Sequence, residues 1–228
     1  MTINSIVNLP FRDRTDAGRL LAARLHLYAG RPDTIVFALP RGGVPVAAEI
    51  AETLRVPLFV LVVRKLGVPG QEELAMGAIT SGGKRLINRD VTSALNIPES
   101  EIDQVAWHET RELLRRDRLY SRGQPMPDVR DKTIILVDDG IATGSSMVLA
   151  VQALREQEAG RIVVAVPVAP RAMVLQLRCL ADEVICLAVP EPFAAVSQWY
   201  QDFAQVTDHE VCSTLDRLVE QTPELEPA

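Results

Sequence analysis

The sequence predicts an α/β fold in which a parallel five-stranded sheet is flanked by helices. Five short apolar segments rich in Val, Ile and Leu alternate with stretches whose apolar residues have helical spacing. Such segments are typical of parallel strands that are buried on both faces. Aromatic residues make up only 4 % of the chain, so aliphatic side chains must supply most of the core. The 228 residues suit one domain with an appended subdomain.

Strands and helices are predicted in a regular order. The predicted strands are Thr34–Leu39, Leu58–Val63, Ile134–Val137, Ile162–Val168 and Glu183–Ala188. The predicted helices are Thr15–Tyr28, Val44–Leu54, Pro98–Tyr120, Ser146–Glu156, Met173–Leu180 and His209–Glu220. The first two strands and the helix between them form a βαβ unit, whose connection is expected to be right-handed. We expect a single domain with a core over about 30–188, and a small hood built from terminal segments, chiefly about 189–221.

The segment after the second predicted strand is less regular. Arg64–Glu73 is polar and contains two glycines and Pro69, which favours a long loop. Leu74–Ile79 and Lys84–Asn88 flank three small residues, Ser81 to Gly83, in a pattern typical of a hairpin.

Composition narrows the classes of function. The net charge of −6 argues against broad nucleic-acid binding, which needs a basic surface, but it permits a locally positive pocket. Cys179, Cys186 and Cys212 have neither metal-ligand spacing nor a disulfide pattern, which favours three reduced thiols. The apolar runs are too short to span a bilayer, and no signal-peptide pattern is visible. We therefore expect a cytoplasmic protein without nucleic-acid or membrane partners.

The segment Thr133–Met147, TIILVDDGIATGSSM, carries the strongest functional signal. An apolar strand ends at Asp138 and Asp139, and a turn with glycines and hydroxyl side chains leads into a helix. Ligands bind at the carboxyl ends of parallel strands, and unpaired N–H groups at a helix start favour an anion. Carboxylates only accept hydrogen bonds, so the aspartates would face hydroxyl groups or a metal. The segment therefore predicts a phosphorylated sugar as ligand. Neither a Walker-type loop nor a Rossmann fingerprint is present.

Within this segment, VDDGIATGS resembles the binding signature for 5-phosphoribosyl diphosphate (PRPP) of type I phosphoribosyltransferases. The resemblance covers about residues 10–215. It implies that Asp138 and Asp139 hold the ribose 2′- and 3′-hydroxyls. It also implies that the loop wraps the 5′-phosphate, so that the PRPP-binding residues include Gly140, Ile141, Ala142, Thr143, Gly144, Ser145 and Ser146.

The resemblance further implies Mg²⁺ as cofactor. The ion would bridge the diphosphate and the ribose hydroxyls and have few direct protein ligands. Asp138 and Asp139 are its candidate ligands, through water or the ribose hydroxyls.

Ala142 departs from one branch of the family. Hypoxanthine–guanine-type members have an aspartate at this position that is thought to act on the purine, whereas uracil-type members can have alanine. Ala142 therefore argues against 6-oxopurine salvage and leaves the predicted PRPP binding unchanged.

Two further segments, each with a cationic side chain, are candidate contacts to the diphosphate. Arg41, Gly42 and Gly43 follow the first predicted strand, where the resemblance implies a diphosphate loop, and the planar guanidinium suits bidentate binding. Arg64 and Lys65 follow the second strand, before a loop that in the family closes over the site and excludes water. The expected catalytic residues are Lys65, Arg41 and Asp139.

The C-terminal aromatic residues are candidates for the acceptor side. Phe193, Trp199 and Tyr200 could stack on a planar base, or they could pin the tail to the core. Glu191, Asp202 and Asp208 are candidate acid or base groups.

Taken together, these residues predict transfer of 5-phosphoribose from PRPP to a small nitrogenous acceptor, with release of diphosphate. Two alternatives stay open: a PRPP-binding regulatory protein, and a phosphosugar hydrolase. The resemblance also suggests a homodimer.

Overall fold

The computed structural model describes residues 8–221, which form a five-stranded sheet with helices on both faces and a projecting arm. The sheet strands are β1 (Thr34–Ala38), β2 (Leu58–Val60), β6 (Thr133–Val137), β7 (Arg161–Val168) and β8 (Glu183–Ala188). All pairs are parallel, in the order β2-β1-β6-β7-β8. The predicted parallel five-stranded sheet is therefore confirmed.

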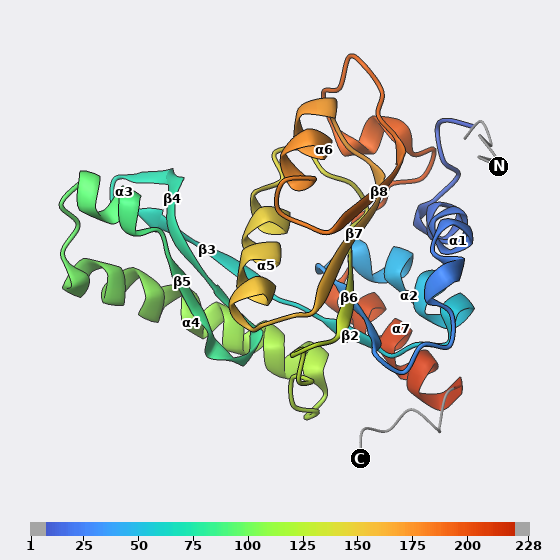
Figure 1. The fold of residues 1–228 in the computed structure, drawn as a ribbon, viewed down its shortest axis with the longest axis horizontal. Helices are drawn as coiled ribbons and strands as arrows, with labels where there is room; N and C mark the ends of the chain where they lie inside the picture. The colour runs from blue at the N-terminus through green and yellow to red at the C-terminus, as the bar shows by residue number, and fades with distance from the viewer. Residues whose placement is uncertain (1–7, 222–228) are drawn as a thin grey trace.

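Helices cover both faces of this sheet (Figure 1). They are α1 (Arg14–Arg24), α2 (Gly43–Leu54), α5 (Ser145–Glu156), α6 (Arg171–Leu177) and α7 (Asp208–Gln221). Alternate strand residues point to opposite faces. Val36, Ile135 and Val163 pack in the cluster that contains α1, α2 and α7. Phe37 and Leu136, one position along, pack in the cluster of α5 and α6.

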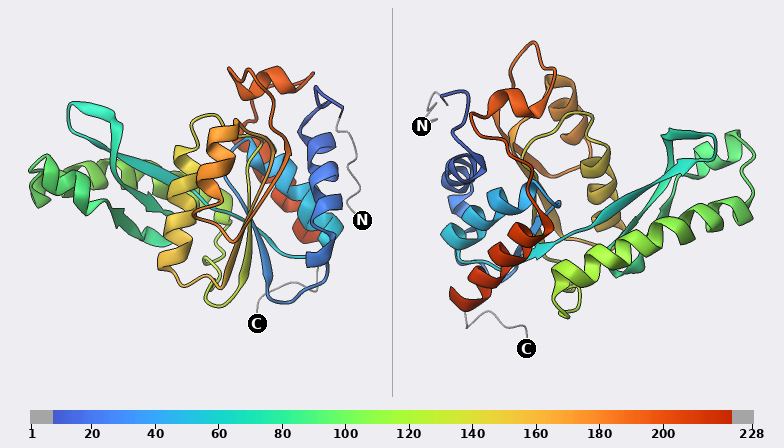
Figure 2. Two further views of the ribbon diagram at one scale, coloured as in Figure 1. Left: turned by 45° about the horizontal axis from the view of Figure 1, so that its top comes forward. Right: turned by 180° about the vertical axis from the view of Figure 1, so that it is seen from behind.

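Residues 63–121 form the arm, which stands clear of the sheet in both views of Figure 2. It contains the antiparallel strands β3 (Val63–Val68), β4 (Gln71–Thr80) and β5 (Arg85–Ile87), a 3₁₀ turn at Ser81–Gly83, and the helices α3 (Arg89–Ala94) and α4 (Glu99–Ser121). The arm leaves the sheet where β2 ends and returns along α4.

The long loop predicted at Arg64–Glu73 is wrong, because these residues belong mostly to β3 and β4. Val68 pairs with Gln71, so the strands are joined by a turn of only two residues, Pro69 and Gly70. Gly70 has a φ of +75°, a conformation that favours glycine at this turn position. The proline and glycine thus mark a tight hairpin and not a long loop.

Three smaller differences concern element boundaries. The predicted second strand, Leu58–Val63, is divided: β2 ends at Val60, and Val63 already belongs to β3. The first helix ends at Arg24 and is followed by the 3₁₀ turn η1 (His26–Tyr28). Helix α3 has no counterpart among the predicted elements.

In the hood, the segment before α1 pairs with the segment between β8 and α7. Phe11 donates its N–H to the Trp199 carbonyl at 2.8 Å, and Gln201 donates its N–H to the Phe11 carbonyl at 2.8 Å. The rings of Phe11 and Tyr200 are buried and lie 5.4 Å apart. A short 3₁₀ turn, η3 (Val196–Trp199), precedes this pairing. The predicted hood of terminal segments is therefore present.

The three cysteines are free thiols, as predicted. Within residues 8–221, no helix combines the length and the apolar character that a membrane crossing needs.

Leu113 tests how the arm is anchored. It lies on α4, is 1 % exposed and packs in the main core cluster, whereas its neighbour Leu114 is 40 % exposed. We expect Leu113→Ala to lower the free energy of unfolding by about 2–5 kcal/mol, because it leaves a cavity. Leu114→Ala should change it by less than about 1 kcal/mol. Urea denaturation of both variants measures this; equal effects would show that α4 is not anchored through Leu113.

Candidate functional site

Two loops separated by about 100 residues meet because β1 and β6 pair in register. Ala38 and Val137, the last residues of the two strands, are partners, and Leu39 donates its N–H to the Val137 carbonyl at 2.9 Å. The loop that follows β1 contains Arg41, and the loop that follows β6 begins with Asp138. The carboxyl edge of the sheet therefore brings together the two sets of residues that the sequence singled out, as open α/β sheets do at ligand sites.

Gly42 and Gly43 let these two loops touch. A Cβ atom on Gly42 would lie 2.0 Å from Oδ2 of Asp139, and one on Gly43 would lie 2.8 Å from the Val137 carbonyl oxygen. The Pro40–Arg41 peptide in this loop is cis. Only glycine permits this approach, which places the backbone of the first loop directly against the carboxylates of the second.

Asp138 and Asp139 are a buried pair of carboxylates. Asp138 accepts the N–H of Asp139 through Oδ1 at 2.8 Å. Burial and the neighbouring charge of Asp139 raise the pKa of Asp138 well above its usual range. Burial also raises the pKa of Asp139, against the opposing effect of the Arg14 guanidinium. The two buried carboxylates therefore favour a ligand that can donate hydrogen bonds to them.

Arg14 is the partner of Asp139, and no feature of the sequence marked it. Its Nε donates to Oδ2 of Asp139 at 2.7 Å, and both side chains are largely buried, at 11 % and 14 % exposed. The guanidinium also donates to the Ala204 carbonyl at 2.8 Å and lies 3.8 Å from the centre of the Phe203 ring. The hydroxyl of Tyr200 donates to the backbone carbonyl of Asp139 at 2.5 Å. The hood therefore holds Asp139 from two sides.

The turn that follows the carboxylates ends at the start of α5. Gly144 is the N-cap of this helix and has a φ of +72°, in the left-handed region that favours glycine. In the described structure the N–H groups of Ala142 and Thr143 donate to no protein acceptor, and the first N–H groups of a helix have none within the helix. The side chains of Thr143, Ser145 and Ser146 line this turn, and those of Ser145 and Ser146 are exposed. Together they form a cradle for an anion.

Ile141 differs from the rest of the turn. Its side chain is 2 % exposed, and its N–H already donates to the Val168 carbonyl at 2.9 Å. The free donors of the cradle therefore begin at Ala142, and Ile141 fixes the turn to β7.

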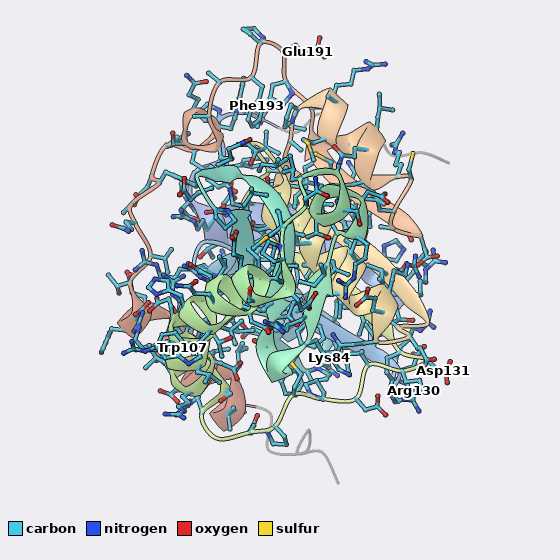
Figure 3. The ribbon with its side chains drawn as sticks, turned by 90° about the vertical axis from the view of Figure 1, so that its left-hand side faces the viewer. Lys84, Trp107, Arg130, Asp131, Glu191 and Phe193 are labelled. Carbon is cyan, nitrogen blue, oxygen red and sulfur yellow. The ribbon has the colours of Figure 1, made fainter. Side chains whose placement is uncertain are left out.

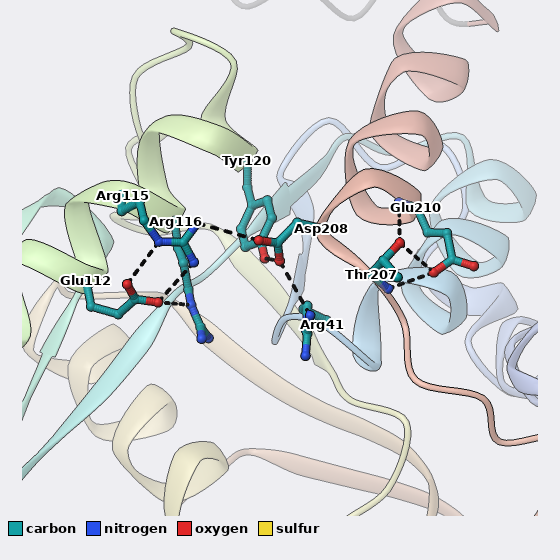
Figure 4. Close-up of polar contacts among 8 residues, drawn as sticks. All are labelled: Arg41, Glu112, Arg115, Arg116, Tyr120, Thr207, Asp208 and Glu210. Carbon is teal, nitrogen blue, oxygen red and sulfur yellow. Dashed lines mark hydrogen bonds and ion pairs between the residues drawn. The ribbon is translucent and has the colours of Figure 1, made fainter.

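Arg41 faces a polar network that joins the core to the arm (Figure 4). Its guanidinium lies 3.7 Å from Oδ1 of Asp208, the first residue of α7. The same carboxylate accepts the hydroxyl of Tyr120 at 2.6 Å and lies 3.5 Å from Arg115, both on α4. These contacts hold the pKa of Asp208 below its usual range, the Tyr120 hydrogen bond being the main cause.

The start of α7 is itself fixed by a capping box. The Glu210 carboxylate accepts the N–H and the hydroxyl of Thr207, at 2.6 and 2.8 Å, and Glu210 donates its own N–H to that hydroxyl. Asp208, between them, is therefore held in place. Of the three candidate acid or base groups, Asp208 is the one that lies against a predicted site residue.

Arg64 and Lys65 are the second and third residues of β3, at the base of the arm. Arg64 donates through Nε to Glu109 of α4 at 2.8 Å. This ion pair ties β3 to α4, so Arg64 supports the arm in the described structure.

The three hood aromatics have different surroundings. Tyr200 is buried and its hydroxyl is bound to Asp139, as described above. Phe193 and Trp199 stack on each other, with ring centres 6.2 Å apart, and Nε1 of Trp199 is buried without a hydrogen-bond partner. Figure 3 shows Phe193 in the loop above the core, on the other side of the molecule from Trp107 on the arm.

A groove of about 560 Å³ separates the arm from α5 and α6. Thr143 and Ser145 of the cradle line it on one side, and Gly77 and Leu86 of the arm line it on the other. The arm thus borders the outer side of the cradle.

The donor set for a metal is small. Within residues 8–221, no three or more His, Cys, Asp or Glu side chains are grouped so that they could hold a metal ion. The loop after β6 offers the carboxylates of Asp138 and Asp139, of which Asp139 is paired with Arg14, and the Asp208 carboxylate lies farther along, 3.7 Å from Arg41. This set fits a Mg²⁺ ion that takes most of its ligands from a bound substrate and from water.

Comparison with known proteins agrees with this geometry. The family model described as "Phosphoribosyl transferase domain" matches residues 12–198. A protein of Mycobacterium tuberculosis H37Rv, named as a "putative phosphoribosyl transferase", is 46 % identical over 207 residues, which are 91 % of this chain and 46 % of the relative. A second strain, CDC 1551, has a protein with the same match. The chain thus spans about half the length of these curated relatives.

A solved structure matches almost completely. The protein TT1426 from Thermus thermophilus is 40 % identical, with a TM-score of 0.83 over 91 % of this chain and 98 % of that one. The two chains therefore share one fold over almost the whole of the Thermus protein.

Gly42→Ala tests the contact between the two loops. We expect the variant to lose about 1–3 kcal/mol of stability, because the new methyl group would overlap a carboxylate that Arg14 holds in place. Thermal or urea unfolding measures the loss. Adding Asp139→Ala should recover part of it, since the overlapping atoms are removed. A double variant that is simply the sum of two losses would contradict the contact.

Proposed function

Because the chain belongs to the phosphoribosyl transferase family, we propose that it transfers 5-phosphoribose from PRPP to a small nitrogenous acceptor and releases diphosphate. One observation carries this proposal: a buried pair of carboxylates lies between an anion cradle and a glycine loop with an arginine. PRPP has the same sequence of groups, a phosphate, a ribose diol and a diphosphate. The three subsites support a ligand with that order of charges.

Each subsite has a defined chemical role in this proposal. The N–H groups of Ala142 and Thr143 and the nearby hydroxyls bind the 5′-phosphate. Asp138 and Asp139 accept from the ribose hydroxyls, and Arg41 binds the diphosphate. Lys65, at the base of the arm, is a second proposed catalytic cation. A bound Mg²⁺ would neutralise charge on the diphosphate, with Asp138 and Asp139 as its nearest protein groups.

The chemistry follows from these positions. The bond between C1 and the diphosphate oxygen breaks as the acceptor nitrogen forms its bond to C1 and releases its proton to solvent, and C1 gains oxocarbenium character on the way, as in glycoside cleavage. The electron pair leaves with the diphosphate, so cations around Arg41 stabilise the departing charge. Asp139, with its negative charge close to the ribose, favours the positive charge that develops on the ring. The residues of the site therefore act by positioning and by electrostatics.

The acceptor side is proposed to lie under the hood. Phe193 and Trp199 are the flat surfaces there, and they stack on each other. Ala142 supplies no carboxylate to the acceptor, which favours an acceptor other than a 6-oxopurine.

Neutral aspartate variants test the ribose subsite. We expect Asp138→Asn combined with Asp139→Asn to weaken PRPP binding at least about 100-fold in titration calorimetry, roughly the loss of two hydrogen bonds from charged groups. Asp138→Asn alone offers a control for folding. Because the pKa of Asp138 is raised in the folded protein, its charge destabilises the fold at neutral pH, and this penalty disappears as pH falls towards about 4.

The single variant should therefore have a higher melting temperature than the wild type near pH ~7 and the same one near pH ~3, while PRPP affinity falls. Unchanged PRPP affinity in the double variant would contradict the assignment of the ribose subsite.

A panel of acceptors tests the reaction. The protein is incubated with PRPP, Mg²⁺ and single purine, pyrimidine or other nitrogenous compounds, and diphosphate release is measured. We expect release that depends on one class of acceptor. Release without any acceptor would indicate a hydrolase, and PRPP binding without release would indicate a regulatory protein.

A further inference from the structure

We propose that Arg14 is the positioning residue of the ribose subsite: it fixes the Asp139 carboxylate so that one oxygen is anchored to the hood and the other faces the sugar. The inference deepens the proposed function and rests on it. It assigns a role to a residue outside both loops, 125 positions away from its partner in the sequence.

The geometry separates the two oxygens of Asp139. Oδ2 accepts from Nε of Arg14 at 2.7 Å and is the carboxylate atom nearest to Gly42. A Cβ on Gly42 would lie 2.0 Å from Oδ2 but 3.1 Å from Oδ1. Oδ2 is thus enclosed by Arg14 and the diphosphate loop. The Asp138 side chain also hydrogen-bonds to this carboxylate, and we assign Oδ1, the oxygen farther from Gly42, to accept a hydrogen bond from a ribose hydroxyl.

Arg14 is itself held more firmly than a surface arginine. Its guanidinium is fixed by three contacts: the Asp139 carboxylate, the Ala204 carbonyl at 2.8 Å, and the face of the Phe203 ring at 3.8 Å. The side chain is only 11 % exposed. An arginine whose guanidinium stacks on a ring and makes two hydrogen bonds can orient a carboxylate, whereas a mobile arginine cannot.

In the described part of the chain, Arg14 is the cation observed in an ion pair with Asp139. Arg14, Asp138 and Asp13 are the charged groups with the largest effects on Asp139 and Tyr200, and Arg41 lies in the neighbouring loop. Of the groups with the largest effects only Arg14 is positive, and the Tyr200 hydroxyl donates its hydrogen bond to the backbone carbonyl of Asp139. Without Arg14 the buried carboxylate would lose the one side-chain ion pair that the described part of the chain gives it. Asp139 would then be free to turn away from the site.

The experiment compares two ligands on the chain of 228 residues. PRPP requires the ribose subsite, whereas inorganic phosphate requires only the cradle. We expect Arg14→Gln to raise the dissociation constant for PRPP about tenfold or more, the effect of losing one charged hydrogen bond. The dissociation constant for inorganic phosphate should change less than about twofold. Arg14→Lys, which keeps a cation, should recover part of the PRPP affinity.

Arg12→Gln is the matched control. Arg12 is two residues away, is 62 % exposed and is paired with Asp13, so the variant loses the same net charge without touching Asp139. It should bind both ligands as the wild type does. Circular dichroism melting confirms that each variant is folded at the temperature of the titration.

Three results would overturn the inference. PRPP affinity that is unchanged in Arg14→Gln would show that Arg14 does not act on the ribose subsite. An equal loss for PRPP and phosphate would show a general structural role, and tighter PRPP binding would show that Arg14 occupies the place of the substrate. A wild-type protein that binds phosphate but no PRPP would instead contradict the proposed function itself.

Discussion

β1 and β6 run side by side in parallel, and the pairing of Ala38 with Val137 decides where everything else in the site lies. A shift of this register by one residue would turn Asp138 from its present side of the sheet to the other. It would also separate Gly42 from Asp139, whose contact has no room for a side chain. Burial favours this register: the strand residues alternate between two apolar clusters, so a slip of one residue would force both clusters to repack. A packing constraint in the core thus fixes a polar geometry at the edge of the sheet.

This geometry buries two adjacent carboxylates, Asp138 and Asp139, which is energetically unfavourable. Proteins seldom bury such groups without partners, because desolvation opposes the charged form. Here the compensation comes from outside the sheet. Arg14 belongs to α1, Tyr200 belongs to the C-terminal hood, and Phe11 joins the two segments by main-chain hydrogen bonds. Helix α1 thus supplies the charge that offsets the burial of Asp139, and the hood supports Arg14 through Ala204 and Phe203. Loss of the hood would remove these two contacts to Arg14.

Features that depend on residues close together in the sequence could be predicted, whereas contacts between distant residues could not. The five strands and the turn at 138–146 could be predicted, because a buried strand and a helix start each leave their pattern within about 10 residues. The arm was only partly predictable: Pro69 and Gly70 mark a turn, but whether strands flank it depends on packing against α4. Arg14 could not be assigned, since it meets Asp139 across 125 positions, and Asp208 was one of three acidic candidates whose contact with Arg41 the sequence does not show. One of several arginines in the chain becomes a site residue only through the way the ends of the chain fold together.

The proposed PRPP side and the proposed acceptor side of the site are built by different means. This explains why the first could be predicted from the sequence and the second could not. The donor half uses main-chain groups at strand ends and a helix start, whose positions are fixed by secondary structure. The acceptor half uses side chains in the segment between β8 and α7, which has only one short 3₁₀ turn. Phe193 and Trp199 there are positioned by contact with each other. Ala142 lies on the loop after β6 and carries no acceptor-binding group, so in our proposal the choice of acceptor depends on the hood. Because the hood also contacts Arg14 through Ala204 and Phe203, the proposed acceptor side and the ion pair of Asp139 share one supporting segment.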